Sequence, residues 1–529
     1  MEMTRRSFIA STAGAIAAGS LAASVAIAEE AAAPQADKVL EADVVVAGLG
    51  TSGLMASVGA AKQGARVIAV DRASMLAATT DIFTHGPFIV GSKLQLQYEN
   101  PLTVEEAMTY LQERSNYAYN GQSLRTILEA TGRAANILID DGGFVFDNSP
   151  FPTSTPESEM INRAAHTYDG RGAERADMFQ KMLDANSVET MFGTKAQSLI
   201  FDAEGAIAGI RCESEDEGII DIYTKAVVLC TGGFLGNAEY QKKYFAGANV
   251  VSKAVAVCDG AGIDMALSAG AQIGKTFSIV MNEYGGANTK AFPITGSNSF
   301  ASANPGNDFL RLAHLACMFV DANGARFTNE GYLAENPFYS GEPLTRQSTY
   351  YAIFDEAYMT RLETEPFANF FHTAKMVRGA GDKVLENARE QFAEAVEQEW
   401  GYKADTLEEL AQALSLPMLP AAVEKYNAAA EAGFDDEFFT KPEYLIPVLQ
   451  APFYAIELQP SAYMSLGGIK CNGNCQALDE RNVVINGLYV AGGDADIHTA
   501  PYLQNGSANG FALGSGLIAG EAAGASAMA

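Results

Sequence analysis

The chain has 529 residues, of which 48% are hydrophobic and 19% are charged, the composition of an ordinary globular protein. Because single hydrophobic cores stop growing at roughly 250–300 residues, this length predicts two or more cores. The formal net charge of −29 argues against nucleic acid and anionic membrane surfaces as partners, since a large negative field repels both.

The first 28 residues have the three parts of an export signal. The arginine pair Arg5-Arg6 comes first, a weakly apolar run rich in Ala, Gly and Ser follows, and the segment closes at Ala28. The pair resembles a twin-arginine signal, so residues 1–28 are predicted to direct export of the folded chain to the periplasm or another extracytoplasmic place. A plain membrane anchor is the alternative, although the run is weakly apolar for a spanning helix. Residues 29–40 are predicted to form a linker.

The six cysteines are few for an exported chain of this length and indicate no disulfide framework. Cys471 and Cys475, in the stretch KCNGNC, are candidates for one loop disulfide, with unpaired thiols as the alternative. The sequence contains no Cys-x-x-Cys-His motif, so we expect no c-type haem on this chain, and no metal site is predicted.

The segment after the linker has the pattern of a nucleotide-binding β-α-β unit. A short apolar run predicts a buried parallel strand, and Gly48, Gly50 and Gly53 follow it at the G-x-G-x-x-G spacing. These glycines allow a tight turn, close approach of the backbone to a pyrophosphate, and close packing of helix on strand. The helix that follows would direct its first N–H groups at the phosphates. A second strand ends at Asp71, whose carboxylate suits an adenosine ribose.

Two further predicted strands end in glycine pairs. One runs from Ala226 to Cys230 and continues into Thr231–Gly233, and the other ends at Gly492–Asp494. A bound NAD needs only the first cradle, whereas FAD needs further strand ends to hold its ribitol and isoalloxazine. The repeated arrangement therefore favours FAD.

Together with the stretches PFYAIEL, SLGGIKCN and GLYVAGGDAD, these segments resemble the fumarate reductase/3-ketosteroid dehydrogenase superfamily of FAD flavoproteins over nearly the whole mature chain. The resemblance implies an α/β fold in which a Rossmann-like FAD-binding domain carries an inserted α+β capping domain. Residues 41–280 and 465–529 would form the FAD-binding domain and residues 281–464 the cap. The active site is then expected between the cap and the flavin.

The FAD is expected to be bound without a covalent link. His85 is the candidate for covalent attachment, but its surroundings, TTDIFTHGPF, do not match the motif of the covalent enzymes. The residues predicted to contact FAD come from the three glycine segments, from the end of the second strand and the residues after it, and from the start of the last helix: Gly48, Gly50, Thr51, Ser52, Gly53, Asp71, Arg72, Thr80, Thr231, Gly232, Gly233, Gly493, Asp494, Ser507 and Ala508.

The side chains by which family fumarate reductases hold a dicarboxylate are missing or displaced. Counted back ungapped from the segment GARFTNE, which ends at Glu330, the family's arginine acid falls on Ala313. The family's substrate histidine falls on Met464, and its second substrate arginine falls on Leu503. A small dianion would find no partner for its charges in a closed site, so fumarate is not expected as the substrate.

Near the end of the chain, Tyr502 and Gly506 have the spacing of the tyrosine and glycine with which ketosteroid dehydrogenases hold a ketone oxygen. Two such donors on one oxygen stabilise the enolate that forms when hydride from flavin N5 reaches the β-carbon of an enone. A proton must then reach the α-carbon, and the candidate donors are Arg311, Tyr463 and His314. Packing roles for the tyrosines and surface roles for Arg311 and His314 are the alternatives.

These features predict an exported FAD-dependent oxidoreductase, an ene reductase that transfers a hydride to the C=C bond of an unsaturated carbonyl compound. The export signal, with no haem and no second cradle for NADH, indicates that a separate redox protein such as a cytochrome supplies the electrons, as in anaerobic respiration. Three alternatives stay open: a ketosteroid-type dehydrogenase working in the oxidative direction, a fumarate-reductase-like enzyme for a carboxylate, and an electron carrier without a substrate. The large inserted segment argues against the carrier.

Overall fold

All elements of the computed structural model belong to one compact unit, Asp37–Ala529. The predicted export signal lies outside the described residues, as do Thr80, His85, Arg311 and His314. The described residues are 34–76, 84, 86–147, 163–164, 166–170, 172–245, 250–252, 258–281, 288–291, 307–310, 317–331, 341–344, 346–370, 382–500, 502–504 and 506–529.

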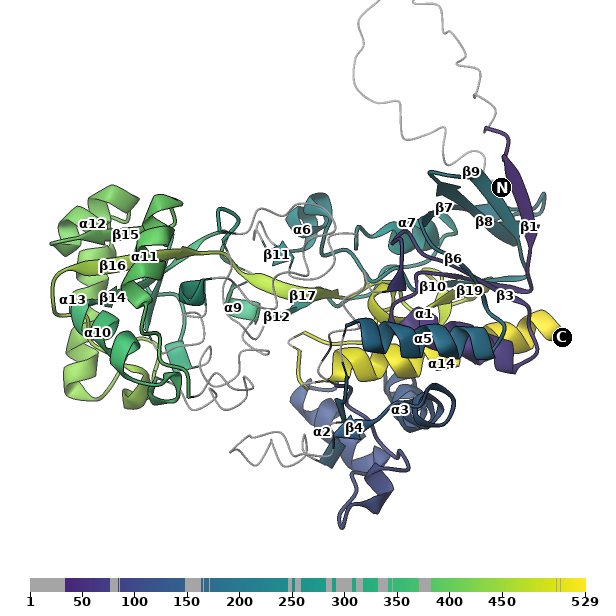
Figure 1. The fold of residues 1–529 in the computed structure, drawn as a ribbon, viewed down its shortest axis with the longest axis horizontal. Helices are drawn as coiled ribbons and strands as arrows, with labels where there is room; N and C mark the ends of the chain where they lie inside the picture. Colours follow the sequence, from purple (N-terminus) through teal and green to yellow (C-terminus); the bar gives the residue numbers. More distant parts are fainter. Residues whose placement is uncertain are drawn as a thin grey trace, which may run out of the picture. The chain divides into compact units, whose positions relative to one another are not determined.

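A parallel sheet with one antiparallel edge strand forms the core of the nucleotide-binding part (Figure 1). Its strands run in the order β18-β19-β10-β2-β3-β6. Their bounds are Gln476–Leu478 (β18), Val484–Val490 (β19), Ala226–Leu229 (β10), Val44–Ala47 (β2), Val67–Val70 (β3) and Glu189–Met191 (β6). Every residue of β2, β3 and β10 is buried, because a parallel sheet is covered on both faces, and this explains their unbroken apolar runs.

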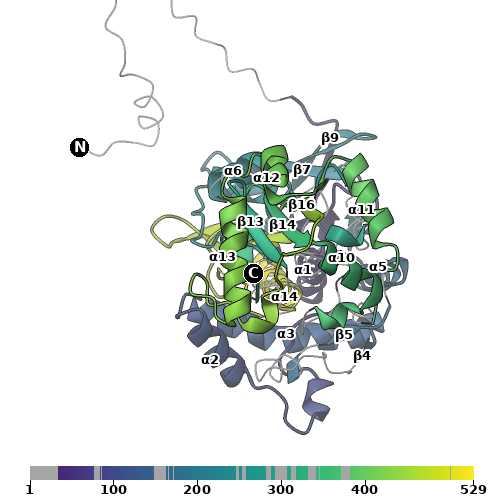
Figure 2. The ribbon, with the colours of Figure 1, turned by 90° about the vertical axis from the view of Figure 1, so that its left-hand side faces the viewer.

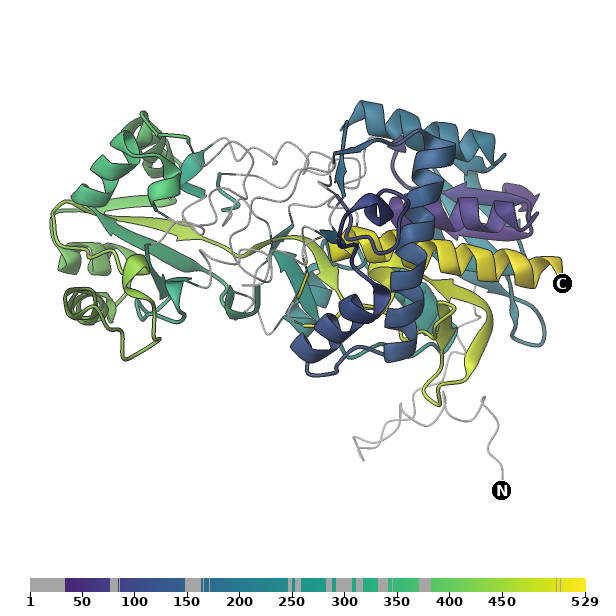
Figure 3. The ribbon, with the colours of Figure 1, turned by 90° about the horizontal axis from the view of Figure 1, so that it is seen from below.

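Two helices from opposite ends of the chain pack together beside this sheet. Helix α14 (Ser507–Met528) contacts both α1 (Thr51–Lys62) and α3 (Gly121–Gly142) (Figure 3). A Cβ at Gly520 would lie 2.0 Å from the carbonyl oxygen of Ala56, so a glycine is required for the helices to approach this closely. The small residues of the last helix are therefore explained by its packing on the first.

The other elements of this part include a second sheet, of order β1-β9-β8-β7. Its strands are Lys38–Glu41 (β1), Gly218–Tyr223 (β9), Ile207–Ser214 (β8) and Thr194–Phe201 (β7). The remaining helices and short strands are α2 (Val104–Arg114), β4 (Phe146–Asp147), β5 (Thr167–Tyr168), α5 (Ala173–Ala185), α6 (Ala238–Tyr244) and α7 (Ala261–Ser268).

The segment inserted between the two pieces of the nucleotide-binding part has its own sheet and its own core. The antiparallel sheet has the order β13-β14-β16-β15, and helices surround it (Figure 2). The strands are Met318–Asp321 (β13), Tyr350–Asp355 (β14), Phe453–Leu458 (β16) and Gly401–Ala404 (β15). The helices around it are Glu356–Thr364 (α10), Ala388–Glu397 (α11), Leu407–Leu414 (α12) and Leu419–Ala432 (α13), while the short helix Gly341–Leu344 (α9) contacts the strand Ser278–Met281 (β12). Separate hydrophobic clusters in the two parts confirm the expectation of two or more cores. The helices and sheets confirm the predicted α/β class.

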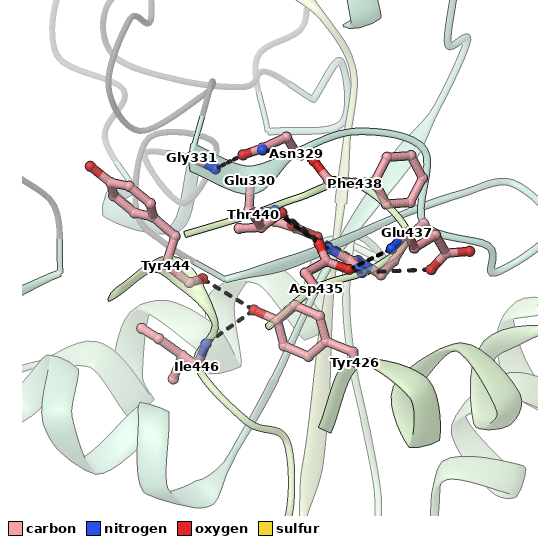
Figure 4. A network of polar contacts seen from close by, with 11 residues as sticks. Asn329, Glu330, Gly331, Tyr426, Asp435, Glu437, Phe438, Thr440, Tyr444 and Ile446 are labelled. Carbon is pink, nitrogen blue, oxygen red and sulfur yellow. Dashed lines mark hydrogen bonds and ion pairs between the residues drawn. The ribbon is translucent and has the colours of Figure 1, made fainter. Parts of the chain in front are cut away.

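A buried ion-pair network holds this inserted segment together (Figure 4). Arg326 Nη2 lies 2.7 Å from Glu330 Oε2 and 2.8 Å from Asp435 Oδ2, and all three side chains are almost completely buried. The guanidinium also lies 4.9 Å from the ring centroids of Tyr426 and Phe438. Buried ion pairs therefore hold the segment GARFTNE against the loop after α13.

A small sheet connects the two parts. Strand β17 (Ser461–Leu466) continues from β16 and pairs with β11 (Val251–Ser252) and β12 (Ser278–Met281). The predicted domain boundaries at 280/281 and 464/465 both fall in this sheet, and as boundaries they stay predictions. Among the helices of the described ranges, none combines the length and the apolar character that crossing a membrane requires.

Candidate active site

The first glycine cradle connects β2 to α1. Gly48 has a φ of 98°, and a Cβ there would lie 2.3 Å from the carbonyl oxygen of Cys230, so no other residue fits. The N–H of Leu49 donates to Asp71 Oδ2 at 2.6 Å, and the N–H of Ala73 donates to Asp71 Oδ1 at 2.8 Å. The carboxylate predicted to contact a ribose thus also fixes the shape of the cradle.

The residue after Asp71 has a charged partner from a distant part of the chain. Arg72 Nη1 lies 2.8 Å from Asp259 Oδ2, in the loop before α7. Lys195 Nζ lies 3.6 Å from the same carboxylate oxygen. The ion pair joins the end of β3 to the loop that precedes α7, beside the glycine segments.

The ends of β10 and β19 are locked together by one buried carboxylate. Asp494 accepts hydrogen bonds from the N–H and the hydroxyl of Thr231 and, at 2.9 Å, from the N–H of Gly233. Burial raises the pKa of Asp494 to about 6, against the effect of these donors. Close packing continues at Gly493, where a Cβ would lie 2.7 Å from the carbonyl carbon of Gly232. The second and third glycine segments are therefore direct neighbours.

The starts of α1 and α14 are open to an anion and are tied to each other. Gly50 and Gly506 are the N-cap residues, so neither N-cap has a side chain that accepts from the helix, and no acidic residue stands in either first turn. Asn509 Nδ2 donates to Thr51 Oγ1 at 3.0 Å, and Tyr168 Oη donates to Asn509 Oδ1 at 3.0 Å. The sequence pattern did not single out Asn509 or Tyr168, because only the fold brings them to Thr51.

Tyr502 lies at the start of α14. Its phenolic oxygen accepts a hydrogen bond from the N–H of Ala508 at 3.0 Å, and the side chain is 4% exposed. Burial raises the pKa of Tyr502, while the Ser507 side chain and the backbone N–H groups of Ala508, Ser507 and Gly506 act in the opposite direction. The hydroxyl of Ser507 donates to the carbonyl of Gln504 at 2.8 Å. The phenol therefore sits among the first amides of the helix.

Strand β17, where the chain runs back from the inserted segment to the nucleotide-binding part, lies beside Tyr502. Tyr502 packs in one apolar cluster with Val280, Leu466 and Met464. Tyr463 is half-buried at a bulge, since its neighbours Ala462 and Met464 pair with consecutive residues of β12. Its role as a proton donor stays a prediction. Ser465, which the sequence pattern did not single out, accepts from the N–H of Phe234 at 3.0 Å and so ties β17 to the second glycine segment.

Two of the three positions of the missing carboxylate-binding residues are described, and both are apolar. Met464 belongs to the Tyr502 cluster, and Leu503 is 8% exposed in the core of the nucleotide-binding part. Ala313, the third, lies outside the described residues. These two side chains give a dicarboxylate nothing to pair with.

The structure adds His498, which the sequence pattern did not single out. Its imidazole is 5% exposed and lies parallel to the ring of Phe511, at 5.2 Å between centroids and 14° between planes. The ring centroid of Tyr502 is 6.4 Å away. Burial lowers the pKa of His498 to about 4, so the ring is neutral at neutral pH.

A family model described as a FAD binding domain matches residues 43–510. The chain belongs to this family of FAD-binding proteins. The flavoprotein is 28% identical over 462 residues to a vinyl phenol reductase of Lactiplantibacillus plantarum, with 86% of this chain and 90% of that protein covered. It is 24% identical over 460 residues to a probable fumarate reductase of Shewanella frigidimarina, with coverages of 85% and 69%.

A solved structure gives the same fold for this flavoprotein. The 3-ketosteroid Δ1-dehydrogenase of Sterolibacterium denitrificans, in complex with 1,4-androstadiene-3,17-dione, superposes with a TM-score of 0.64 at 18% identity. The match covers 92% of this chain and 100% of that one. The predicted superfamily and its Rossmann-like fold with an inserted cap are confirmed.

The residues present fit FAD, as predicted for this flavin-dependent oxidoreductase. A Cβ at Gly53 would lie 1.8 Å from the carbonyl oxygen of Gly48, which is the close packing that the pyrophosphate-binding turn requires. The start of α1 would face the pyrophosphate, and the second and third glycine segments with the start of α14 would hold the flavin half. Which of the fifteen named residues touch FAD stays a prediction, and His85, the candidate for a covalent link, lies outside the described residues.

Proposed function

We propose that this flavoprotein reduces the C=C bond of an unsaturated carbonyl compound that is uncharged or carries one negative charge. The hydrogen bond between the Ala508 N–H and the Tyr502 phenol carries the proposal. Vinyl phenol and fumarate, which appear in the names of two relatives, both contain a conjugated C=C bond, and this supports the reaction class.

Tyr502 would act as a polarised donor to the substrate oxygen. Bound FAD supplies a hydride from its N5 atom. The phenolic oxygen accepts from the Ala508 N–H, and a phenolic hydroxyl can donate its own hydrogen to a substrate oxygen. As negative charge develops on that oxygen, a donor held by a helix start stabilises it without reorganisation. In this proposal the Ala508 amide of α14 would act through the phenol, and direct contact of Gly506 with the substrate stays a prediction.

The apolar positions Met464 and Leu503 support the choice of substrate charge. A dianion would enter this site at the cost of two uncompensated charges, whereas a ketone or a monoanion would not. Tyr463 remains the described candidate for the proton donor, with Arg311 and His314 as the others. We also propose that the protein is exported by the twin-arginine route, works outside the cytoplasm and receives electrons from a separate redox protein, which its net charge of −29 would favour if that partner is basic.

The test is the variant Tyr502→Phe, which keeps the ring and removes the donor. Turnover of a conjugated enone with a reduced viologen should fall about 10²–10³-fold, as for the loss of one oxyanion donor. The FAD content should not change. Tyr489→Phe is the matched control, since that buried phenol donates to the carbonyl of Ala522 at 3.4 Å, away from the start of α14. Equal turnover in the two variants would remove Tyr502 from the reaction.

The oxidative direction is the second candidate, supported by the fold shared with the ketosteroid dehydrogenase. In that case the enzyme would oxidise a saturated ketone with an oxidised dye as electron acceptor faster than it reduces the enone with reduced viologen as electron donor. The same Tyr502 donor would serve both directions, because the enolate is common to them.

A further inference from the structure

The imidazole of His498 is a buried polar group without a hydrogen bond. Neither Nδ1 nor Nε2 has a partner in the part of the chain that the structure describes, although the side chain is 5% exposed. Buried polar atoms in native proteins are nearly always paired, so this one requires an explanation. An unpaired ring in a corner that also holds Tyr502 is explained if a bound molecule supplies the partner.

The surroundings hold the ring in one orientation. Its face lies against Phe511, and Phe511 in turn meets the ring of Tyr119 edge to face, at 6.3 Å between centroids. The carbonyl of His498 accepts from the hydroxyl of Thr276 at 2.9 Å. Stacking and the backbone contact together fix the directions in which the two nitrogens point.

The charge state limits the chemistry of the missing partner. Burial lowers the pKa of His498 to about 4, so at neutral pH one ring nitrogen carries a hydrogen and the other a lone pair. A hydroxyl group can accept from the first or donate to the second, and a water or second polar atom can complete the pair. A carboxylate or an ether offers only acceptors, and a hydrocarbon offers neither.

We propose that His498 binds a hydroxyl group of the substrate and so selects hydroxylated aromatic compounds among the unsaturated molecules that enter the site. The inference rests on the proposed function and narrows its substrate class. The rings of Tyr502 and Phe511 beside the imidazole, with Tyr119 against Phe511, suit a flat ring. His498 is a specificity-determining residue in this role, and it takes no part in hydride transfer.

The test compares two ketones that differ by one hydroxyl group: 4-(4-hydroxyphenyl)but-3-en-2-one and 4-phenylbut-3-en-2-one. The FAD-loaded wild type should reduce the hydroxylated ketone with a kcat/KM at least tenfold higher. His498→Phe should lose at least tenfold of that preference, while its Tm without substrate should equal or exceed that of the wild type, because an unpaired polar group is replaced by an apolar ring of similar shape. His498→Gln, which keeps a donor and an acceptor, should retain most of the preference.

Binding of the saturated products, measured by calorimetry, tests the inference even if neither ketone is reduced. Failure of the wild type to reduce either enone would refute the proposed function but not the role of His498 in binding. The wild type should bind 4-(4-hydroxyphenyl)butan-2-one at least tenfold more tightly than 4-phenylbutan-2-one, and His498→Phe should not. An equal preference in the wild type and His498→Phe, a loss of Tm that affects both ketones alike, or no binding of either product would overturn the role of His498.

Discussion

We expect His498 to contribute to the loss of folding stability at acidic pH. The pKa of this residue is near 4 in the folded protein and about 6.5 in the unfolded chain. Between these values the unfolded chain binds the extra proton, so the wild type keeps its full stability above pH 6.5 and loses stability as the pH falls towards 4. His498→Phe lacks this titration. The stability of the variant relative to the wild type should therefore rise by up to about 1.4 kcal/mol per pH unit as the pH falls from 6.5 to 4.

Thermal unfolding of the two proteins over this pH range measures the effect. Among the described residues, the other histidine with a depressed pKa is His166, which is buried beside Ser92 in both proteins, so its effect cancels in the comparison. A difference in Tm that is independent of pH would mean that His498 takes up its proton in the folded state as readily as in the unfolded one.

At the scale of single residues, the sequence was enough to predict the roles of residues whose type is required by the backbone geometry. Gly48, Gly53 and the glycine pairs stand where a Cβ has no room, so their spacing alone is informative. His498 and Asn509 could not be predicted in this way. Their importance comes from which neighbours they have or lack after folding, and residue spacing carries no record of that.

Among the structural elements, the loop after α13 depends on the Arg326 network. Arg326→Met would leave Glu330 and Asp435 buried without their cation, and breaking such a pair costs about 3–5 kcal/mol. Although burial alone would raise the pKa of Asp435, Arg326 holds it below its ordinary value, so protonation at low pH should recover part of the loss. Urea unfolding of the variant at pH 7 and pH 4 measures both effects.

Arg389→Met is the matched control. Arg389 also meets two carboxylates of the inserted segment, Glu356 at 2.6 Å and Glu363 at 3.1 Å, but its side chain is 45% exposed. Water screens that pair, so its loss should cost about 0–1 kcal/mol. Similar losses of stability in the two variants would show that burial does not make the Arg326 ion pairs more costly to break than the exposed ones.

At the scale of structural elements, the sequence predicted where the strands lie better than which strands pair with one another. The unbroken apolar runs of β2 and β10 are typical of parallel strands covered on both faces. The pairing of β17 with β11 and β12 could not be predicted, because it joins residues about 180 to 210 positions apart and no local pattern specifies such a partner. That sheet is what brings Met464 and Tyr502 into one cluster.

For the whole molecule, length predicted two or more cores, which follows from the general limit on core size. The inserted cap was expected from the resemblance to the flavoprotein superfamily. The substrate could not be predicted from such general limits. It depends on the small set of side chains around the start of α14, where an apolar residue in place of a charged one changes the chemistry without changing the fold.

The most direct test of the central claim is anaerobic rapid mixing of the reduced holoenzyme with 4-(4-hydroxyphenyl)but-3-en-2-one and, separately, with fumarate. The return of the visible absorbance of oxidised flavin reports electron transfer to each compound. We expect rapid, saturable reoxidation by the enone and almost none by fumarate, because Tyr502 can hold one oxygen whereas Met464 and Leu503 cannot pair with two carboxylates. Rapid reoxidation by fumarate, with the enone inert, would contradict the account.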